Sequence, residues 1–241
     1  MIRKLTAMAF FSLACSRPLA AADHPSLDVF GGFSAQPYSV YGYLGGVTPM
    51  NGNLAIDGFL ARLAVGVGGY SYQITPAVRQ SVGQQQADAM LGYQVFLFDV
   101  ARLSAYAGIE MQNHDNSDTA AVIRGAHVGA KGQIELYSPI GQKFYGFALG
   151  TLSSNYTSYY TKAKIGYRIS DRFSFGPEGS AQGNSQYDQV STGAALGFKL
   201  GRAEFYLSGG YLWDLRSQGG GGPSGPGSSG LYGQAGFGLR F

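Results

Sequence analysis

The sequence predicts an all-β fold, a transmembrane antiparallel up-and-down β-barrel of about twelve strands. Three observations carry this prediction. Apolar and polar residues alternate with a period of two over long segments, the connections between these segments are alternately short and long, and glycine and aromatic residues are abundant. A barrel in a membrane needs such alternation, because one face of each strand meets lipid and the other meets the lumen.

The first residues have the composition of a cleavable secretory signal peptide. Arg3 and Lys4 give a positive start, residues 5–14 form an apolar run too short to span a bilayer as a helix, and residues 20–22 offer a small-residue cleavage site. We therefore expect a signal peptide over residues 1–22 and a single barrel domain over residues 23–241. A lipoprotein signal ending at Cys15 is the alternative, but Ser12 stands where an aliphatic residue is expected.

Removal of the signal changes the charge of the mature chain. Three of the 17 Lys and Arg residues (Arg3, Lys4 and Arg17) leave with it, whereas all 14 Asp and Glu residues stay, so the mature chain is neutral. No basic surface remains that would indicate binding to nucleic acid. The single cysteine, Cys15, leaves as well, which excludes disulfides, thiol catalysis and cysteine-ligated metals.

The remaining composition favours strands over helices. Glycine accounts for 38 of the 241 residues, and tyrosine and phenylalanine contribute 17 and 15. Glycine is a poor helix former, whereas aromatic and β-branched residues are frequent in strands. No apolar run approaches the ~18 residues that a membrane helix needs.

Alternation defines the individual strands. Apolar residues such as Leu63, Ile109 and Leu207 occupy one parity, and charged residues recur on the other. About eleven residues at ~3.3 Å rise and ~40° tilt cover ~28 Å, enough for the ~25 Å apolar band of an outer-membrane barrel. The expected strands are residues 26–36, 38–49, 57–73, 84–97, 100–112, 123–137, 143–153, 157–169, 172–181, 188–200, 203–214 and 231–241.

The connections between these strands alternate in length. One set consists mostly of short turns, at residues 50–56, 97–99, 138–142, 170–171 and 201–202. The other set is mostly longer and more polar, at residues 74–83, 113–122, 182–187 and 215–230. Short turns at one end, long loops at the other and an even strand number are typical of outer-membrane barrels, and they place both termini at the periplasmic end.

The last strand carries a separate signal for assembly. Its alternating face ends on a terminal phenylalanine and consists of Leu231, Gly233, Ala235, Phe237, Leu239 and Phe241. It resembles the C-terminal signature by which outer-membrane barrels are recognised, and Phe237, Leu239 and Phe241 are its candidate residues. A soluble β-sandwich is the alternative fold, but its strands average ~5–6 residues and are shorter than these.

Two short motifs match ligand-binding patterns but lack the context that such sites need. Residues 225–230 fit G-x-G-x-x-G, yet they lie in a Gly/Ser/Pro-rich stretch that leads into a strand and not into a helix. Residues 113–118 are rich in oxygen ligands, yet they lack the glycine and distal glutamate of a calcium loop. We interpret both as surface loops, with adventitious divalent-ion binding as the alternative for the second, and expect no metal site and no cofactor.

The histidines and serines do not indicate catalysis. After the signal the chain has three histidines, His24, His114 and His127, and it has no G-x-S-x-G motif. We place His24 in the N-terminal tail, His114 in a loop and His127 on the inward face near one end. No nucleophile–base pair can be singled out, so we expect no catalytic residues.

The inward face of the strands is the candidate functional surface. Tyrosines on it would stack on sugar rings, and Arg or Glu would hydrogen-bond hydroxyl groups. Charges of both signs on one wall usually pair with each other, so we favour a self-satisfied polar plug over a binding surface. The inward set is Arg62, Asp88, Arg102, Tyr106, Glu110, Lys131, Glu135, Tyr160, Lys162, Lys164, Arg168, Glu178, Lys199, Glu204, Tyr206, Tyr232 and Arg240.

The bulk of the inward residues determines the width of the lumen. Eight strands are filled by side chains and sixteen leave a channel, so twelve lie between these cases. Small inward residues would leave space that long charged side chains cross, which predicts a narrow polar lumen. These small residues are Gly108, Gly146, Ala148, Gly150, Gly210, Gly236 and Gly238.

Several segments occur in an order that is typical of one known family. They are residues 29–33, 41–46, 51–54, 57–62, 106–115, 131–137, 166–168, 176–184 and 210–214. Together they resemble the alphaproteobacterial cellulose biosynthesis protein BcsS family over essentially the whole mature chain, whereas residues 219–230 look like an insertion. The resemblance implies a role accessory to cellulose synthesis or export, and it brings no defined catalytic residues.

We therefore expect an exported, non-enzymatic barrel in the outer membrane of a Gram-negative cell, acting as a glucan conduit or as a scaffold. Its expected partners are outer-membrane lipid and cellulose or other cellulose-synthesis components. A small general or substrate-specific porin unrelated to cellulose is the alternative. An outer-membrane enzyme acting on lipid or glycan ranks third.

Overall fold

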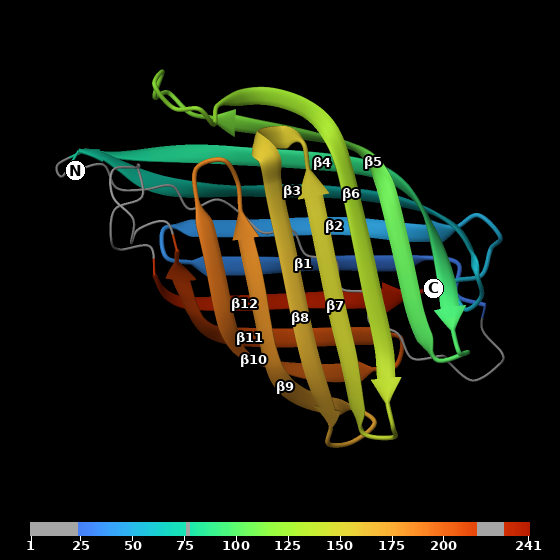
Figure 1. Cartoon of the computed structure of the whole chain (residues 1–241). Coiled ribbons are helices and arrows are strands. Elements are labelled where there is room, and N and C mark those ends of the chain that lie inside the picture. Colours follow the sequence, from blue (N-terminus) through green and yellow to red (C-terminus); the bar gives the residue numbers. More distant parts are fainter. Residues whose placement is uncertain (1–23, 76–77, 216–228) are drawn as a thin grey trace.

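The computed structural model describes residues 24–75, 78–215 and 229–241, which form a closed antiparallel β-barrel (Figure 1). Each strand pairs with its neighbours in sequence, and β12 closes the barrel on β1. The prediction of a twelve-stranded up-and-down barrel is confirmed for this part of the chain. The strands are β1 Asp28–Gln36, β2 Ser39–Pro49, β3 Gly58–Thr75, β4 Val78–Leu97, β5 Ala101–Asp115, β6 Gly125–Ile140, β7 Phe144–Ser153, β8 Ser158–Arg168, β9 Phe173–Gly183, β10 Asp188–Leu200, β11 Ala203–Asp214 and β12 Gly230–Arg240.

Closure brings the two ends of the described chain together beside the short turns. Asp28 pairs with Arg240 in the ladder between β1 and β12, and their side chains form an ion pair at 3.4 Å. Phe241 continues this ladder, because its N–H donates to the Leu27 carbonyl at 2.9 Å and its carbonyl accepts from the Ser26 N–H at 2.6 Å. The terminal residue therefore helps to close the barrel. The expected signal peptide, residues 1–22, lies outside the described residues.

The strands extend further at the loop end than the sequence predicts. Residues 74–83 were expected to form a loop, but β3 runs to Thr75 and β4 begins at Val78, so this prediction is wrong. The polar residues of the segment still pair across the hairpin, with Ser71 opposite Ser81 and Gly69 opposite Gly83. A strand continues through polar side chains as long as its backbone N–H and C=O groups find partners. The polar composition of residues 74–83 therefore predicted a loop where the two strands in fact continue. Most of the expected loop 215–230 lies outside the described residues.

The outer face of the barrel is apolar. Leu63, Ile109 and Leu207 are 65%, 62% and 62% exposed, as is expected of a wall that faces lipid. Aromatic residues gather on this face near both ends, which is typical of the two interfaces of a membrane. The ring pairs are Phe59 with Tyr93 (4.9 Å between centroids), Phe144 with Tyr167 (5.1 Å) and Phe173 with Phe198 (5.0 Å) near the turns, and Tyr211 with Trp213 (5.0 Å) near the loops.

Strand β7 faces the opposite way from the prediction. Tyr145, Phe147 and Leu149 are buried inside the barrel, so the small residues expected to point inward, Gly146, Ala148 and Gly150, lie on the outer face. The pairing of β7 with β6 decides this, because Glu135 lies opposite Leu149, and directly paired residues share a face of the sheet. Both parities of β7 are apolar or small, so alternation within the strand could not identify its inner face.

Candidate functional site

The predicted inward residues lie where the structure buries side chains inside the barrel. Nine of the thirteen favoured candidates are buried: Arg62, Tyr106, Glu110, Lys131, Glu135, Tyr160, Lys162, Glu178 and Tyr206. The other four, Lys164, Arg168, Glu204 and Arg240, are partly exposed. The three residues of the expected assembly signal follow the outward parity of β12: Phe237 and Leu239 are partly exposed, and Phe241 is 54% exposed.

A chain of buried charges joins four consecutive strands. Asp88 on β4 pairs with Arg62 on β3 and with Lys131 on β6, whose Nζ lies 2.7 Å from Asp88 Oδ2. The same Nζ lies 2.7 Å from an oxygen of Glu110 on β5. Two cations and two carboxylates therefore alternate, so each buried charge lies beside one of opposite sign. Amide and hydroxyl groups of Gln86, Gln112 and Ser153 donate to the remaining acceptor positions of Glu110.

A second polar cluster lies on the strands opposite. Lys162 on β8 forms an ion pair with Glu178 on β9, with 2.8 Å between Nζ and Oε2. Tyr232 on β12 donates to the other oxygen of Glu178 at 3.1 Å, and Lys162 also donates to Gln234 at 3.3 Å. The bonds from β8 and β9 to β12 span strands that are not neighbours in the wall, so they cross part of the interior.

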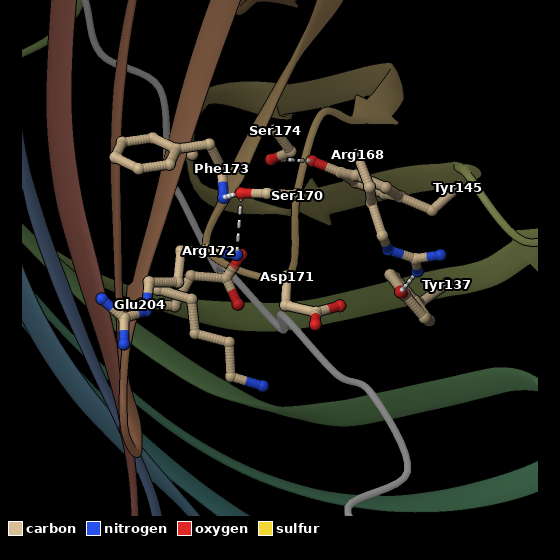
Figure 2. Close-up of a pocket in the computed structure, with 11 residues that line it drawn as sticks. Tyr137, Tyr145, Arg168, Ser170, Asp171, Arg172, Phe173, Ser174 and Glu204 are labelled. Atoms are coloured by element: carbon tan, nitrogen blue, oxygen red, sulfur yellow. Dashed lines mark hydrogen bonds between the residues drawn. The ribbon is translucent and has the colours of Figure 1, made fainter.

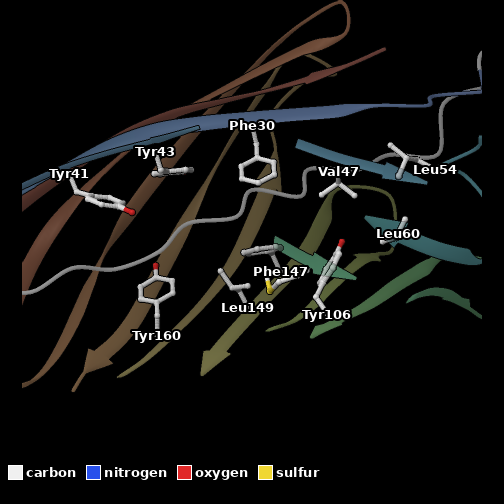
Figure 3. Close-up of a cluster of buried hydrophobic side chains, with 11 residues drawn as sticks. Phe30, Tyr41, Tyr43, Val47, Leu54, Leu60, Tyr106, Phe147, Leu149 and Tyr160 are labelled. Carbon is white, nitrogen blue, oxygen red and sulfur yellow. The ribbon is translucent and has the colours of Figure 1, made fainter. Parts of the chain in front are cut away.

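Aromatic side chains close the interior between these clusters (Figure 3). Tyr41 and Tyr43 on β2 stack at 6.3 Å with 24° between their planes. They belong to one buried cluster with Phe147 on β7 and Tyr160 on β8, strands that lie half-way round the barrel from β2. In Figure 3 the hydroxyls of Tyr41 and Tyr160 point toward each other. Side chains of opposite walls thus meet in the middle of the barrel.

Inward glycines are covered by aromatic rings of the neighbouring strand. A Cβ atom at Gly66 would lie 1.8 Å from the Tyr41 hydroxyl, and one at Gly236 would lie 2.1 Å from the Tyr206 ring. Gly32, Gly45, Gly92 and Gly166 meet the rings of Tyr43, Phe30, Tyr106 and Tyr145 in the same way. The expectation that Gly236 leaves open space is therefore wrong, because the Tyr206 ring lies there, a pairing that stabilises sheets. A Cβ atom at Gly238, by contrast, would meet no atom closer than 4.0 Å.

The sequence reasoning missed several of the residues that close the barrel. Phe30, Tyr41, Tyr43, Phe147 and Leu149 are all buried, and none was among the candidates. The predicted tyrosines lie on strands whose charged residues mark the inward parity, whereas β2 and β7 carry no charged residue. On β1 phenylalanine occupies both parities, at Phe30 and Phe33, so the cross-strand pairing shows which ring points inward.

A pocket at the turn end is lined by residues of β6 to β11 and of the β8–β9 turn (Figure 2). Its volume is about 50 Å³, and Arg168 and Glu204 are among its lining residues. Arg168 donates to the Tyr137 hydroxyl at 2.8 Å, and Tyr137 lies 5.9 Å from the ring of Tyr145. Three of the predicted inward residues, Arg168, Lys199 and Glu204, therefore line a polar mouth.

The three histidines lie in different surroundings. His114 was expected in a loop, but it lies on β5 and is 3% exposed, with Nδ1 3.3 Å from the Tyr70 hydroxyl, so that prediction is wrong. His127 keeps the inward parity but is exposed at the loop end, and His24 contacts Asn53 at 3.0 Å. Among the described residues, no three His, Cys, Asp or Glu side chains are grouped to hold a metal. Within the same residues, no helix has the length and apolar character to cross a membrane.

Comparison with known families gives one match over nearly the whole chain. The family model described as cellulose biosynthesis protein BcsS matches residues 29–241. No match was found among the curated proteins.

Comparison with solved structures finds barrels of similar architecture. The chain is similar to the KdgM porin, with a TM-score of 0.51, 10% identity, and coverage of 89% of this chain and 99% of that chain. It is also similar to the TodX deltaS2S3 mutant monoaromatic hydrocarbon channel, with a TM-score of 0.54, 10% identity, and coverage of 92% and 91%. At such identities the similarity concerns the fold alone.

Proposed function

Because the chain belongs to the cellulose biosynthesis protein BcsS family, we propose that it is a non-enzymatic outer-membrane accessory of cellulose synthesis or export. In this proposal the signal peptide over residues 1–22 directs export, and the apolar outer wall anchors the barrel in outer-membrane lipid. The barrel acts as a scaffold for the glucan or for other components of the cellulose machinery, with its interior closed.

The observation that carries the scaffold role is the contact between opposite walls. Tyr41 and Tyr43 belong to one buried cluster with Phe147 and Tyr160, and ion pairs occupy the interior on either side. Porins of sixteen to eighteen strands leave an aqueous channel, whereas side chains from opposite walls meet inside this twelve-stranded barrel. A closed interior therefore favours an accessory role over a general porin.

The test combines conductance with cellulose output. The purified protein in planar bilayers should show no stable conductance, while deletion of its gene should lower cellulose production and the wild-type gene should restore it. Large conductance that cello-oligosaccharides leave unchanged would support a porin and contradict the proposal. Normal cellulose output without the protein would overturn the accessory role.

A gated glucan conduit is the second candidate, and one observation favours it. Within the described residues, the interior is closed by side chains of the wall strands, and rotation of a few such side chains would open a path. Tyr106 and Tyr206 would then contact the passing glucan. The same bilayer experiment separates the two roles, because a conduit requires a small conductance that added cello-oligosaccharides reduce.

A further inference from the structure

We infer that the loop end of the barrel holds a binding site for a neutral, hydroxyl-rich saccharide, roofed by Tyr156 and lined by Gln84, His114, Asn184 and Tyr187. This inference rests on the proposed function, since a glucan is the ligand of that class that a cellulose accessory would meet. It concerns the opposite end of the barrel from the pocket in Figure 2.

The lining of this chamber is polar but nearly uncharged. Among its lining residues Glu110 is the single acid or base, apart from His114. Glu110 already accepts from Gln112 at 2.7 Å and from Ser153 at 2.6 Å, and it pairs with Lys131. What remains for a ligand is a set of amides, hydroxyls and aromatic rings. Such a set matches a neutral polyol better than an anion, a cation or a lipid chain.

Buried amide oxygens in and below the chamber lack donors. Gln84 is 3% exposed and Gln86, two residues deeper on β4, is 4% exposed. The Oε1 atom of each has no hydrogen-bond partner among the described residues, and neither has Oε1 of Gln186 beside the chamber. A buried acceptor without a donor destabilises the folded state. The hydroxyl groups of a saccharide supply the donors that these acceptors lack.

The roof is a strained segment. The Tyr156 ring packs against His114, His127 and a buried apolar cluster, and the Tyr156 carbonyl accepts from the backbone N–H of the β9–β10 connection at 2.9 Å. Tyr156 and Thr157 both adopt left-handed backbone conformations, with φ of 54° and 53°, which is costly for residues other than glycine. They belong to the short 3₁₀ turn η1 Asn155–Thr157 between β7 and β8. The Tyr156 hydroxyl donates to the Arg124 carbonyl at 3.2 Å, and its ring lies 5.4 Å from that of His114.

Movement of this roof would admit the ligand. The chamber has a volume of about 20 Å³, room for about one water molecule, so a sugar ring enters only when a lining side chain such as Tyr156 moves. Its ring would then lie against the apolar face of a sugar. Tyr187 lines the chamber from the connection between β9 and β10, and burial raises the pKa of its hydroxyl, so this part of the lining stays uncharged.

Binding of cellohexaose to the full mature protein in detergent tests the inference. Calorimetry should detect binding by the wild type. Gln84→Leu removes the unpartnered acceptor at similar size, and Tyr156→Gly removes the ring while relieving the left-handed strain. Each should weaken binding at least tenfold. Gln142→Leu, at an exposed position of the turn end, is the matched control and should bind as the wild type does.

The outcomes separate this inference from the proposed function. Heat-dependent gel migration would first establish that each variant is a folded barrel. Absence of binding to the wild type, or equal binding by Gln84→Leu, Tyr156→Gly and the control, would mean that the chamber holds water only and would overturn the inference. If cellulose output still depends on the protein, the accessory role survives that failure. Binding that is lost in both variants supports the site whatever the cellulose phenotype.

Discussion

The hydroxyl oxygens of Tyr43 and Tyr206 lie 2.8 Å apart, although 163 residues separate them in the chain. Tyr43 belongs to β2 and Tyr206 to β11, and β1 and β12 lie between these strands in the wall. The bond therefore crosses part of the interior and joins two rings that rest on Gly32 and Gly236. The bond shows that side chains of β2 and β11 meet inside the barrel.

Removing this tyrosine pair should open the interior. Tyr43→Phe removes one hydroxyl and keeps the ring, so it should cost about 1 kcal/mol of unfolding free energy and leave the bilayer conductance at the wild-type level. Tyr43→Ala combined with Tyr206→Ala removes both rings and should produce measurable conductance. Equal conductance in the two variants would show that these rings do not close the path.

Arginine on the outer face should destabilise the barrel. Leu63→Arg, Ile109→Arg and Leu207→Arg each place a charge in the lipid-facing band and should cost about 2–4 kcal/mol near mid-bilayer, measured by urea unfolding in lipid vesicles. Phe98→Arg is the control, because Phe98 is 93% exposed in the β4–β5 turn. A cost at Phe98 as large as that at Leu63 would contradict the assignment of the outer face.

Arginine at two inward serines, Ser104 and Ser208, serves as a comparison with the outer face. Ser104 is 1% exposed and Ser208 is 9% exposed within a packed interior. A larger side chain at either position must displace its neighbours, so both substitutions should be destabilising as well.

The stability that the chain of buried charges gives the barrel should depend on Asp88. Asp88→Ala leaves Arg62 buried without its carboxylate and Lys131 with Glu110 alone, and it should cost about 3–5 kcal/mol of unfolding free energy. Arg62→Met combined with Asp88→Leu removes a cation with the anion and should cost less than Asp88→Ala. If the double variant is the less stable of the two, the ion pair stabilises the barrel beyond its desolvation penalty.

The packing of rings on glycines should make inward glycines intolerant of a side chain. Gly66→Ala would place Cβ against the Tyr41 hydroxyl and should cost about 1–3 kcal/mol through displacement of that ring. Gly42→Ala is the control, since its Cβ would meet no atom closer than 3.7 Å. Comparison of the two midpoints of urea unfolding measures the effect, and similar midpoints would argue against ring packing at Gly66.

The terminal phenylalanine should matter for barrel closure and assembly. Deletion of Phe241 removes its backbone bonds to Ser26 and Leu27 and the last residue of the expected assembly signal. The deleted chain should yield less of the fast-migrating unheated form in outer-membrane fractions than the full chain does. Phe241→Tyr, which keeps the backbone and an aromatic ring, should restore it, and wild-type levels in the deletion would exclude such a role.

The architecture could be predicted because every strand of a membrane barrel alternates between residues that face lipid and residues that face the interior. Period-two alternation placed Leu63, Ile109 and Leu207 on the outer face and Arg62, Glu110 and Lys131 inside, as the structure has them. The rule failed on β7, where Tyr145, Phe147 and Leu149 lie inward and small residues face outward. There both parities are compatible with lipid, so register with β6 decided the face.

The sequence by itself determined the strand number, the closed antiparallel order and the family, since these depend on periodicity, turn placement and motif order along the chain. Only the tertiary structure decided that the interior is filled. Contacts such as Tyr43 with Tyr206, Tyr41 with Gly66 or Lys131 with Asp88 join residues whose distance depends on the curvature and stagger of the whole sheet. No local pattern encodes that geometry, because it arises when β12 closes on β1.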